Sequence, residues 1–553
     1  MDKNTWIGFL LIAAIIVGFA MLSRPSKEQL AERQRINDSI RIAQEMEREA
    51  QMLSDSIQAT ITNAENTKAD TISDDMLREQ MVAVYGPFAP AAQGTDSEVI
   101  LENNLLRLHI ASKGGAISCA ELKEYRAYGD SVNPLTLFKG SDETDLSFTL
   151  VTANNRILAT RNLYFEAQQP NPQNVVMRLK TDVEDAYIDF IYTLPEDTYM
   201  FDFQIVPHNA NLVLAQNMNS LEMQWNQRIP QQERGRKFEE RYAHLQYMTT
   251  NLEQERMSEA KHDTKRESGK VRWIGYKDQF FSTVMIANDA FTSCEFESTP
   301  EGAHTRYIKE FNTKAGVGFD LSGQQPTSFR YFMGPNNYNL LKSYDHNAEN
   351  EAIKLHLQEI VLQGWRIIIW INQIFSFPVF DWLLRFGLPI GWVILLMTLI
   401  IKLIILPFVF ASYKSSAKMR VLKPQIDEIN AKYPMDKMQE RQQATMALYQ
   451  RAGVSPMSGC LPMLFQMPIL MAMFWFFPIA IELRGQSLWW AEDLSAYDAI
   501  LTWGTSIPLL GDHLSLFCLI MTVANLGYTI ITMQSQATDP NMKFMKWMMY
   551  LMP

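Results

Sequence analysis

Long stretches without charge constrain this chain more than any other feature. Four such segments occupy residues 4–23, 391–410, 452–481 and 514–538, and Lys402 is the single charged residue within them. A helix needs about 20 apolar residues to cross about 30 Å of hydrocarbon. The predicted membrane spans are residues 1–23, about 388–410, 457–481 and 514–535, and the start of a fifth at about 544.

The two ends of the sequence need separate interpretation. The apolar region at residues 6–22 is longer than the core of a usual signal peptide, and Met21-Leu22-Ser23 is a poor cleavage site. We therefore interpret residues 1–23 as an uncleaved N-terminal anchor, with a cleaved signal peptide as the alternative. Because the sequence stops at Pro553, inside the fifth predicted span, we expect it to be a C-terminally truncated fragment of a longer protein.

Loop charges orient the predicted spans. Residues 411–455 carry eight Lys/Arg against four Asp/Glu, a net charge of +4, whereas residues 482–513 carry one arginine against five acidic residues, a net charge of −4. Lys and Arg accumulate in the cytoplasmic loops of membrane proteins. The sequence therefore places residues 411–455 in the cytoplasm and residues 24–386 on the outer side.

The external region contains two parts that differ in composition, followed by a connector. Residues 24–84 hold eight Lys/Arg against twelve Asp/Glu, which favours a solvated, partly helical linker, with a short coiled coil as the alternative. In residues 85–345, apolar and polar residues alternate at 106–110, 146–150 and 201–205. Turn signals occur at Gly114-Gly115 and Pro195-Glu196-Asp197. We predict an all-β sandwich there.

Residues 346–386 connect this domain to the membrane core. Only 14 residues, 367–380, are uncharged, and Pro378 interrupts them, so we predict an amphipathic helix lying in the external interface. The predicted fold class is thus an α-helical polytopic membrane core, residues 387–553, with a large external all-β sandwich domain.

The sequence shows none of the short motifs that mark common active sites. It has no His-Glu-x-x-His, Cys-x-x-Cys or Gly-x-Ser-x-Gly. Four cysteines in 553 residues exclude a disulfide scaffold. Cys119 and Cys294 both lie in the external domain and either pair or remain two separate buried thiols. We expect no enzyme activity, no cofactor and no metal site.

Polar side chains recur inside the predicted spans. Lys402 lies near the middle of its span, where a cation costs roughly 2.5–3.5 kcal/mol on insertion scales, and Thr398 lies one helical turn away. Gln466 and Asn525 are amides inside later spans, and Asn525 shares a helical stripe with several threonines. The predicted residues of a hydrated, positively charged groove are Lys402, Thr398, Gln466, Asn525, Thr522 and Thr529. The alternatives are a lysine that reaches the interface and hydroxyls that bond back to their own helix.

The basic loop 411–455 has the pattern of a helical hairpin. Apolar residues follow helical spacing on both sides of Pro434. A basic cytoplasmic surface attracts anionic lipid or ribosomal RNA, and a merely solvated face is the alternative. The predicted contact residues are Lys418, Arg420, Lys423 and Arg441.

At these residues the chain resembles a known family. The segment AKMRVLKPQI at 417–426 is similar to the cytoplasmic hairpin of the YidC/Oxa/Alb family of membrane protein insertases. The motifs that extend this resemblance are ALY at 447–449, GVSPMSGCLP at 453–462, LFQMPI at 464–469, ELR at 482–484, DLSA at 493–496 and TDP at 538–540. The resemblance covers residues 365–553. Gly114-Gly115 and YFMGP at 331–335 match the Gram-negative YidC form more weakly.

The resemblance implies a function and a location. Such proteins insert membrane proteins and help them to fold, alone or with the Sec translocon, without nucleotide hydrolysis. The implied partners are nascent membrane proteins, the Sec translocon, the ribosome and membrane lipids, and no DNA. The implied location is the bacterial inner membrane, with several spans and the large domain in the periplasm. Thr398 and Gln466 match groove positions of the family. The family usually has arginine where this chain has Lys402, which keeps the charge but loses the bidentate fork.

Two other classes of function remain as alternatives. A membrane transporter also carries polar residues along an intramembrane path, and solute flux in sealed vesicles would distinguish it. An anchored periplasmic carbohydrate-binding protein is the second, and glycan binding by the external domain would distinguish that.

Overall fold

The computed structural model describes residues 74–534 except 131, 347, 349, 351–352, 434–436, 454–460 and 508–510. The predicted anchor, most of the predicted linker and the predicted fifth span lie outside the described residues. The chain divides into two compact units, residues 1–79 and 80–553. The first described element is helix α3 (Asp74–Tyr85).

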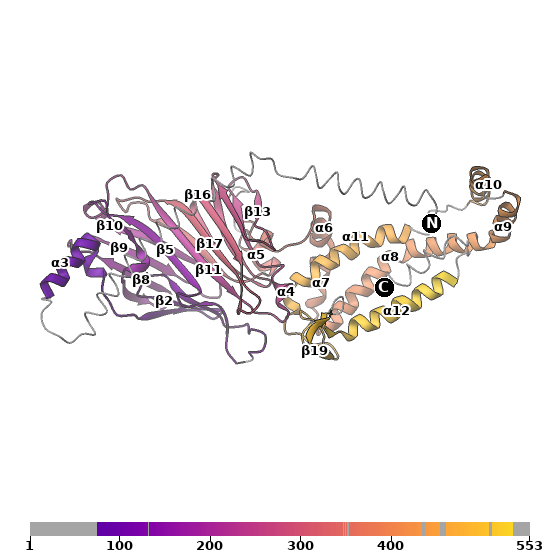
Figure 1. Ribbon diagram of the computed structural model, residues 1–553, viewed down its shortest axis with the longest axis horizontal. Coiled ribbons are helices and arrows are strands. Elements are labelled where there is room, and N and C mark those ends of the chain that lie inside the picture. The colour runs from indigo at the N-terminus through magenta and orange to yellow at the C-terminus, as the bar shows by residue number, and fades with distance from the viewer. Residues whose placement is uncertain are drawn as a thin grey trace. The chain divides into compact units, whose positions relative to one another are not determined.

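The β domain contains a small and a large antiparallel sheet (Figure 1). The four-stranded sheet has the order β1 (Glu98–Glu102), β2 (Leu106–Ala111), β3 (Ile117–Leu122) and β4 (Leu135–Lys139). The main path of the 14-stranded sheet is β6 (Ile157–Ala159), β5 (Thr144–Val151), β11 (Ser220–Pro230), β17 (Tyr307–Gly318), β16 (Phe281–Pro300), β18 (Thr327–Pro335), β10 (Met200–His208), β9 (Tyr187–Thr193), β8 (Asn174–Lys180) and β7 (Glu166–Asn171). Strands joined beside this path are β12 (His244–Thr249), β13 (Gln254–Arg256), β14 (Asp263–Glu267) and β15 (Val271–Lys277).

Alternation of side chains explains why these segments form strands. In β2, Leu106, Leu108 and Ile110 are fully buried, whereas the residues between them are partly exposed. The predicted strands at 106–110, 146–150 and 201–205 are confirmed as β2, β5 and β10. The predicted Gly114-Gly115 turn joins β2 to β3, and both glycines adopt the positive φ that a side chain disfavours.

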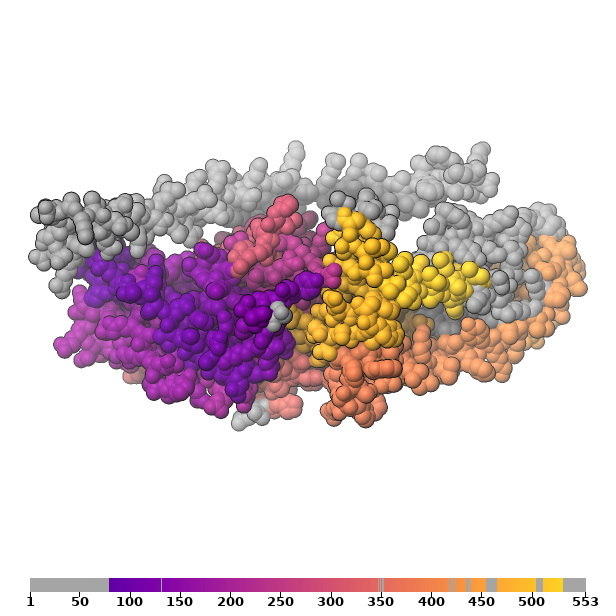
Figure 2. Space-filling model, turned by 90° about the horizontal axis from the view of Figure 1, so that it is seen from below, coloured from indigo at the N-terminus to yellow at the C-terminus, as the bar shows by residue number. Residues whose placement is uncertain are grey.

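The large sheet folds back on itself around an aromatic core. Phe148 of β5 packs against Phe190 of β9, with 5.8 Å between ring centroids, and against Phe203 of β10 and Phe329 of β18. Three strands separate β5 from β18 along the sheet, so these contacts join two faces of one bent sheet. The prediction of a large all-β domain is confirmed. In Figure 2 the residues of this domain, from indigo to magenta, form one closely packed body.

The helical region follows the β domain in the chain. The short helices α5 (Tyr338–Ser343) and η4 (Leu357–Ile360) lead into it, whereas α4 (Arg236–Glu239) lies within the β domain, between β11 and β12. The elements of the region itself are α6 (Arg366–Ile371), the π-helix η5 (Asn372–Ser376), α7 (Phe377–Leu384), α8 (Ile390–Val421), α9 (Lys423–Lys432), α10 (Met438–Arg451), α11 (Leu461–Phe476) and α12 (Leu516–Gln534). Strands β19 (Leu501–Ile507) and β20 (Gly511–Leu514) form a small hairpin before α12.

Two helical segments in the described part of the chain are long and apolar enough to cross a membrane. They are Arg366–Leu384 and Ile390–Ser415, and two shorter apolar helices cover Phe465–Ile479 and Leu516–Ile530. The structure therefore has a helical core with two candidate spans. The full set of predicted spans remains a prediction.

The connector forms one helical segment, as the sequence predicted for part of it. Pro378 does not end the helix, which continues from Arg366 to Leu384 through η5. Pro378 is the second residue of α7 and follows directly on η5, where the wider π-turn already replaces the regular α-helical hydrogen bonds. The buried Asn372 amide donates to the Gln363 carbonyl, and its oxygen accepts a hydrogen bond from the Ser376 hydroxyl at 2.7 Å. These bonds hold the π-turn in place.

Cys119 and Cys294 do not form a disulfide. Both are free, buried thiols in the structure. The sequence allowed either a disulfide or two separate thiols, and the structure shows two separate thiols.

Candidate functional site

Helix α8 carries the two predicted groove residues nearest to each other in sequence. The side chains of Lys402 and Thr398 are both exposed. Among the described residues, Lys402 has neither a hydrogen-bond partner nor an ion-pair partner. The Thr398 hydroxyl donates to the Ile394 carbonyl of its own helix at 2.9 Å, as in the alternative interpretation of the threonines. Within the described parts of the chain, Lys402 is thus an exposed cation without a partner, in the apolar stretch of α8.

Helix α11 carries Gln466 and contacts α6, η5 and α8, with further aromatic contacts to α7. Phe465 stacks on Phe408 of α8, with ring centroids 4.2 Å apart. At the other end of α11, Phe476 contacts Phe377 and Phe380 of α7, each at 5.2 Å. Gln466 is half-buried next to the Phe465 stack. These contacts fix α11 between α8 and α7.

Helix α12 carries the other three predicted groove residues. Asn525 is exposed, and Thr522 and Thr529 are half-buried. The Thr522 hydroxyl donates to the Cys518 carbonyl at 2.8 Å. Within the described part of the chain, no hydrogen bond joins these three residues to Lys402, Thr398 or Gln466. The structure therefore places the predicted residues on three helices, with no hydrogen bond among them in the described part of the chain, and the groove remains a prediction.

The cytoplasmic hairpin predicted from the sequence is formed by α9 and α10, which contact each other. Helix α8 continues without a break to Val421, so the first arm of the basic loop extends a candidate span (Figure 1). Lys418 is exposed near the end of α8, and Arg441 is half-buried on α10. Arg420 and Lys423 lie at the α8–α9 junction, and their side chains are outside the described parts of the structure.

Sequence reasoning missed a polar contact between the β domain and the segment after α11. Arg484 Nε donates to Glu233 Oε1 at 2.6 Å. Asn337 donates to the Glu482 carboxylate at 2.8 Å, and Gln279 donates to the Pro478 carbonyl at 3.0 Å. The sequence assigned Glu482 and Arg484 to an external acidic loop and to a family motif, and predicted no partner for either side chain. Nothing in the local pattern around Glu233 indicates a partner this far away in the chain.

Burial shifts the titration of several groups beside this contact. Desolvation raises the pKa of Glu233 to about 8, although the neighbouring Arg484 opposes that rise. Desolvation also raises the pKa values of Glu239 and Asp278. The pKa of the buried Lys277 falls to about 7 for the same reason. The β domain thus carries a buried group of ionisable side chains next to the helical region.

Comparisons with known proteins cover most of this architecture. The family model described as YidC periplasmic domain matches residues 98–377, and the one described as 60Kd inner membrane protein matches residues 382–553. The membrane protein insertase YidC of Parabacteroides distasonis is 47% identical over 565 residues, which cover 100% of this chain and 87% of the relative. The YidC of Bacteroides fragilis is 43% identical over 557 residues, covering 100% and 86%. A crystal structure of an active YidC insertase aligns with 86% of this chain and 90% of its own, at 19% identity and a TM-score of 0.29.

Proposed function

This chain belongs to the YidC family of membrane protein insertases, and we propose that it inserts inner-membrane proteins and helps them to fold, alone or with the Sec translocon. The proposal includes a hydrated, positively charged groove that receives the polar part of the substrate. Its location would be the bacterial inner membrane, with several spans and the β domain in the periplasm.

The proposal of a charged groove rests mainly on Lys402. Its ammonium lies on a helix whose other residues from 391 to 410 are uncharged, and it has no acidic partner among the described residues. An unpaired cation at that depth costs roughly 2.5–3.5 kcal/mol unless it faces water or a transient partner. An acidic residue in the tail of a substrate would supply such a partner. Thr398, one turn away, would add a hydroxyl to the same face.

A path for the apolar part of the substrate is available on α11. Phe465, Leu470 and Phe474 are exposed, with Phe474 at 68%. In the proposed mechanism, the hairpin of α9 and α10 contacts the nascent chain or its ribosome. The groove then hydrates the polar tail, which lowers its desolvation cost. The apolar helix of the substrate slides along the exposed face of α11 into lipid.

The test is insertion of a short single-span protein into liposomes that contain the reconstituted insertase. Protease protection of the translocated tail would be measured for an acidic and a neutral tail. We expect Lys402→Ala to lower protection of the acidic tail about tenfold, which corresponds to a loss of about 1.4 kcal/mol. Lys402→Arg should retain activity because it keeps the charge.

Lys414→Ala is the matched control, since Lys414 is another exposed lysine on α8 but lies beyond the apolar stretch. It should insert both tails as the parent protein does. Equal protection of the acidic tail by Lys402→Ala and Lys414→Ala would contradict the charged groove. Protection no greater than that of empty liposomes for the parent protein would contradict insertion without the Sec translocon.

A further inference from the structure

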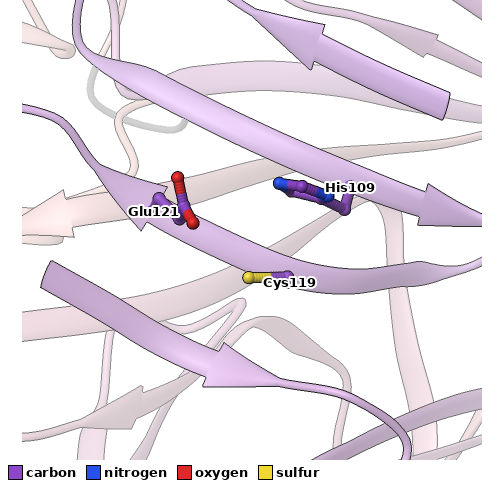
Figure 3. A group of neighbouring side chains, drawn as sticks. All are labelled: His109, Cys119 and Glu121. Carbon is purple, nitrogen blue, oxygen red and sulfur yellow. The ribbon is translucent and has the colours of Figure 1, made fainter. Parts of the chain in front are cut away.

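Pairing of β2 with β3 brings together three side chains that are scattered in the sequence. The register sets His109 opposite Cys119 and Arg107 opposite Glu121. Cys119 and Glu121 are two residues apart on one strand, so they point to the same face of the sheet. One potential ligand atom from each of His109, Cys119 and Glu121 lies within 4.8 Å of the other two. Figure 3 shows the three side chains directed toward a common space.

The histidine is already oriented as a metal ligand. Its Nδ1 lies 3.1 Å from Oε2 of Glu98 on β1, and Oε1 of Glu98 accepts a hydrogen bond from the Ser118 hydroxyl. When Nδ1 of His109 carries the ring proton and donates it in a hydrogen bond to Glu98, Nε2 is unprotonated and its lone pair is available to a metal. Metal-binding histidines characteristically donate their other ring N–H to a carboxylate in this way. Nε2 is itself buried and has no hydrogen-bond partner among the described residues, and Figure 3 shows that end of the ring turned toward the other two side chains.

We propose that His109, Cys119 and Glu121 form a binding site for a divalent transition metal, with Zn²⁺ as the best match. Zn²⁺ takes nitrogen, thiolate sulfur and carboxylate oxygen ligands in a tetrahedral arrangement. With bonds of about 2.0–2.3 Å, tetrahedral ligand atoms are roughly 3.5 Å apart, so the three side chains need to approach by only about an ångström. Three protein ligands leave the fourth position for water.

The neighbouring charged side chains allow Glu121 to bind a metal. Arg107 Nη1 lies 3.2 Å from Glu121, but its Nε also bonds to Glu102 at 2.8 Å. A metal can therefore take the Glu121 carboxylate without leaving Arg107 unpaired. The thiol of Cys119 is buried. On binding, an S–metal bond forms and the thiol proton passes to solvent.

The sequence predicted no metal site because it contains neither a His-Glu-x-x-His nor a Cys-x-x-Cys motif. The site becomes visible only when the strand register is known. The family comparisons concern whole domains and do not address this group of residues.

The test uses the full chain in detergent after chelator treatment, with Co²⁺ and Zn²⁺ alone as probes. We expect one equivalent of Co²⁺ to produce a thiolate-to-cobalt charge-transfer band, which Zn²⁺ then displaces. Cys119→Ser should abolish the band. His109→Gln, which keeps the thiol, should weaken Zn²⁺ binding at least tenfold, and Glu98→Gln should weaken it by about tenfold through the ring orientation.

Cys294→Ser is the matched control, because Cys294 is the other buried free thiol of the β domain and lies outside the group. It should bind both metals as the parent protein does. Circular dichroism of each variant separates loss of the site from loss of the fold. If the charge-transfer band is missing from the parent protein, or if folded His109→Gln binds Zn²⁺ with unchanged affinity, the proposal is wrong.

Discussion

Arg484 and Glu233 form a buried contact between segments that are 251 residues apart in the chain. Only 10% of the Arg484 side chain and 8% of the Glu233 side chain are exposed. Arg484 also donates from Nη2 to the Arg126 carbonyl at 2.6 Å, and its guanidinium lies over the Phe281 ring. One side chain after α11 therefore contacts three separate segments of the β domain.

We expect Arg484→Ala to destabilise this contact by about 1–3 kcal/mol at pH 7, the usual cost of leaving a buried hydrogen-bonding group unpaired. A broken buried ion pair typically costs about 3–5 kcal/mol of stability. We expect Arg484→Ala to cost less, because Glu233 has a pKa of about 8 and can hold a proton when Arg484 is removed. Thermal unfolding in detergent measures the effect, and amide hydrogen exchange of residues 478–484 localises it.

The double variant Glu233→Gln with Arg484→Ala provides the control for coupling. Since the two side chains share one contact, the double variant should lose less stability than the sum of the single variants. Strict additivity would show that the contact between them contributes nothing.

The buried ionisable groups should give the unfolding temperature opposite slopes in two pH ranges. The folded-state pKa of Glu233 is about 8, above its ordinary value of 4.5, so its contribution is complete below pH 4.5 and is lost as the pH rises to 8. The folded-state pKa of Lys277 is about 7, below its ordinary value of 10.5. Its contribution is therefore complete above pH 10.5 and is lost as the pH falls to 7.

These two contributions are separable by substitution. Glu233→Gln should flatten the fall in unfolding temperature between pH 5 and 8, and Lys277→Met should flatten the rise between pH 7 and 10. Calorimetric or fluorescence melting over this pH range measures both slopes. Unchanged profiles in both variants would mean that other groups dominate the pH dependence.

The aromatic core of the β domain should depend strongly on Phe148. Its ring is 1% exposed and contacts rings from β9, β10 and β18. We expect Phe148→Ala to cost about 3–5 kcal/mol, since it leaves a cavity between the two faces of the bent sheet. Ile157→Ala is the control because Ile157 is 75% exposed on β6, and it should change stability by less than about 0.5 kcal/mol. A similar loss in both variants, measured by thermal unfolding, would contradict this account of the core.

Local pattern predicted the strands but not their arrangement. Alternation over five residues was enough to identify β2, β5 and β10, because burial of one face depends only on the period of the side chains. The order of the large sheet depends on pairings between distant segments, such as β5 with β11 and β11 with β17. No property of a single strand encodes such a partner.

The candidate sites also divide into those visible in a local stretch of sequence and those that depend on distant segments. Lys402 was identifiable because a charge inside an apolar stretch is a local anomaly. Glu233 lies in the segment QQERGRK at 231–237, whose composition indicates an exposed loop, yet its side chain is buried by a partner from the helical region. His109 and Cys119 likewise required the strand register.

The two faces of the segment Arg366–Leu384 predict its depth in the membrane. One face of this helix packs on α11 through Phe377 and Phe380. The other face exposes large apolar side chains, among them Trp370 at 64% and Trp382 at 52%. An apolar face of this kind is stable only against lipid, and tryptophans favour the headgroup level.

We expect the segment to lie in the external interface rather than to span the bilayer, although its length alone would permit a span. Variants that retain only Trp370 or only Trp382 would be reconstituted with lipids brominated at shallow or deep acyl positions. In an interfacial helix, both tryptophans should be quenched more strongly by the shallow bromines. In a spanning helix they would differ, because 12 residues of helix separate them by about 18 Å along the axis. Strong deep quenching of one tryptophan and shallow quenching of the other would therefore make this segment a membrane span.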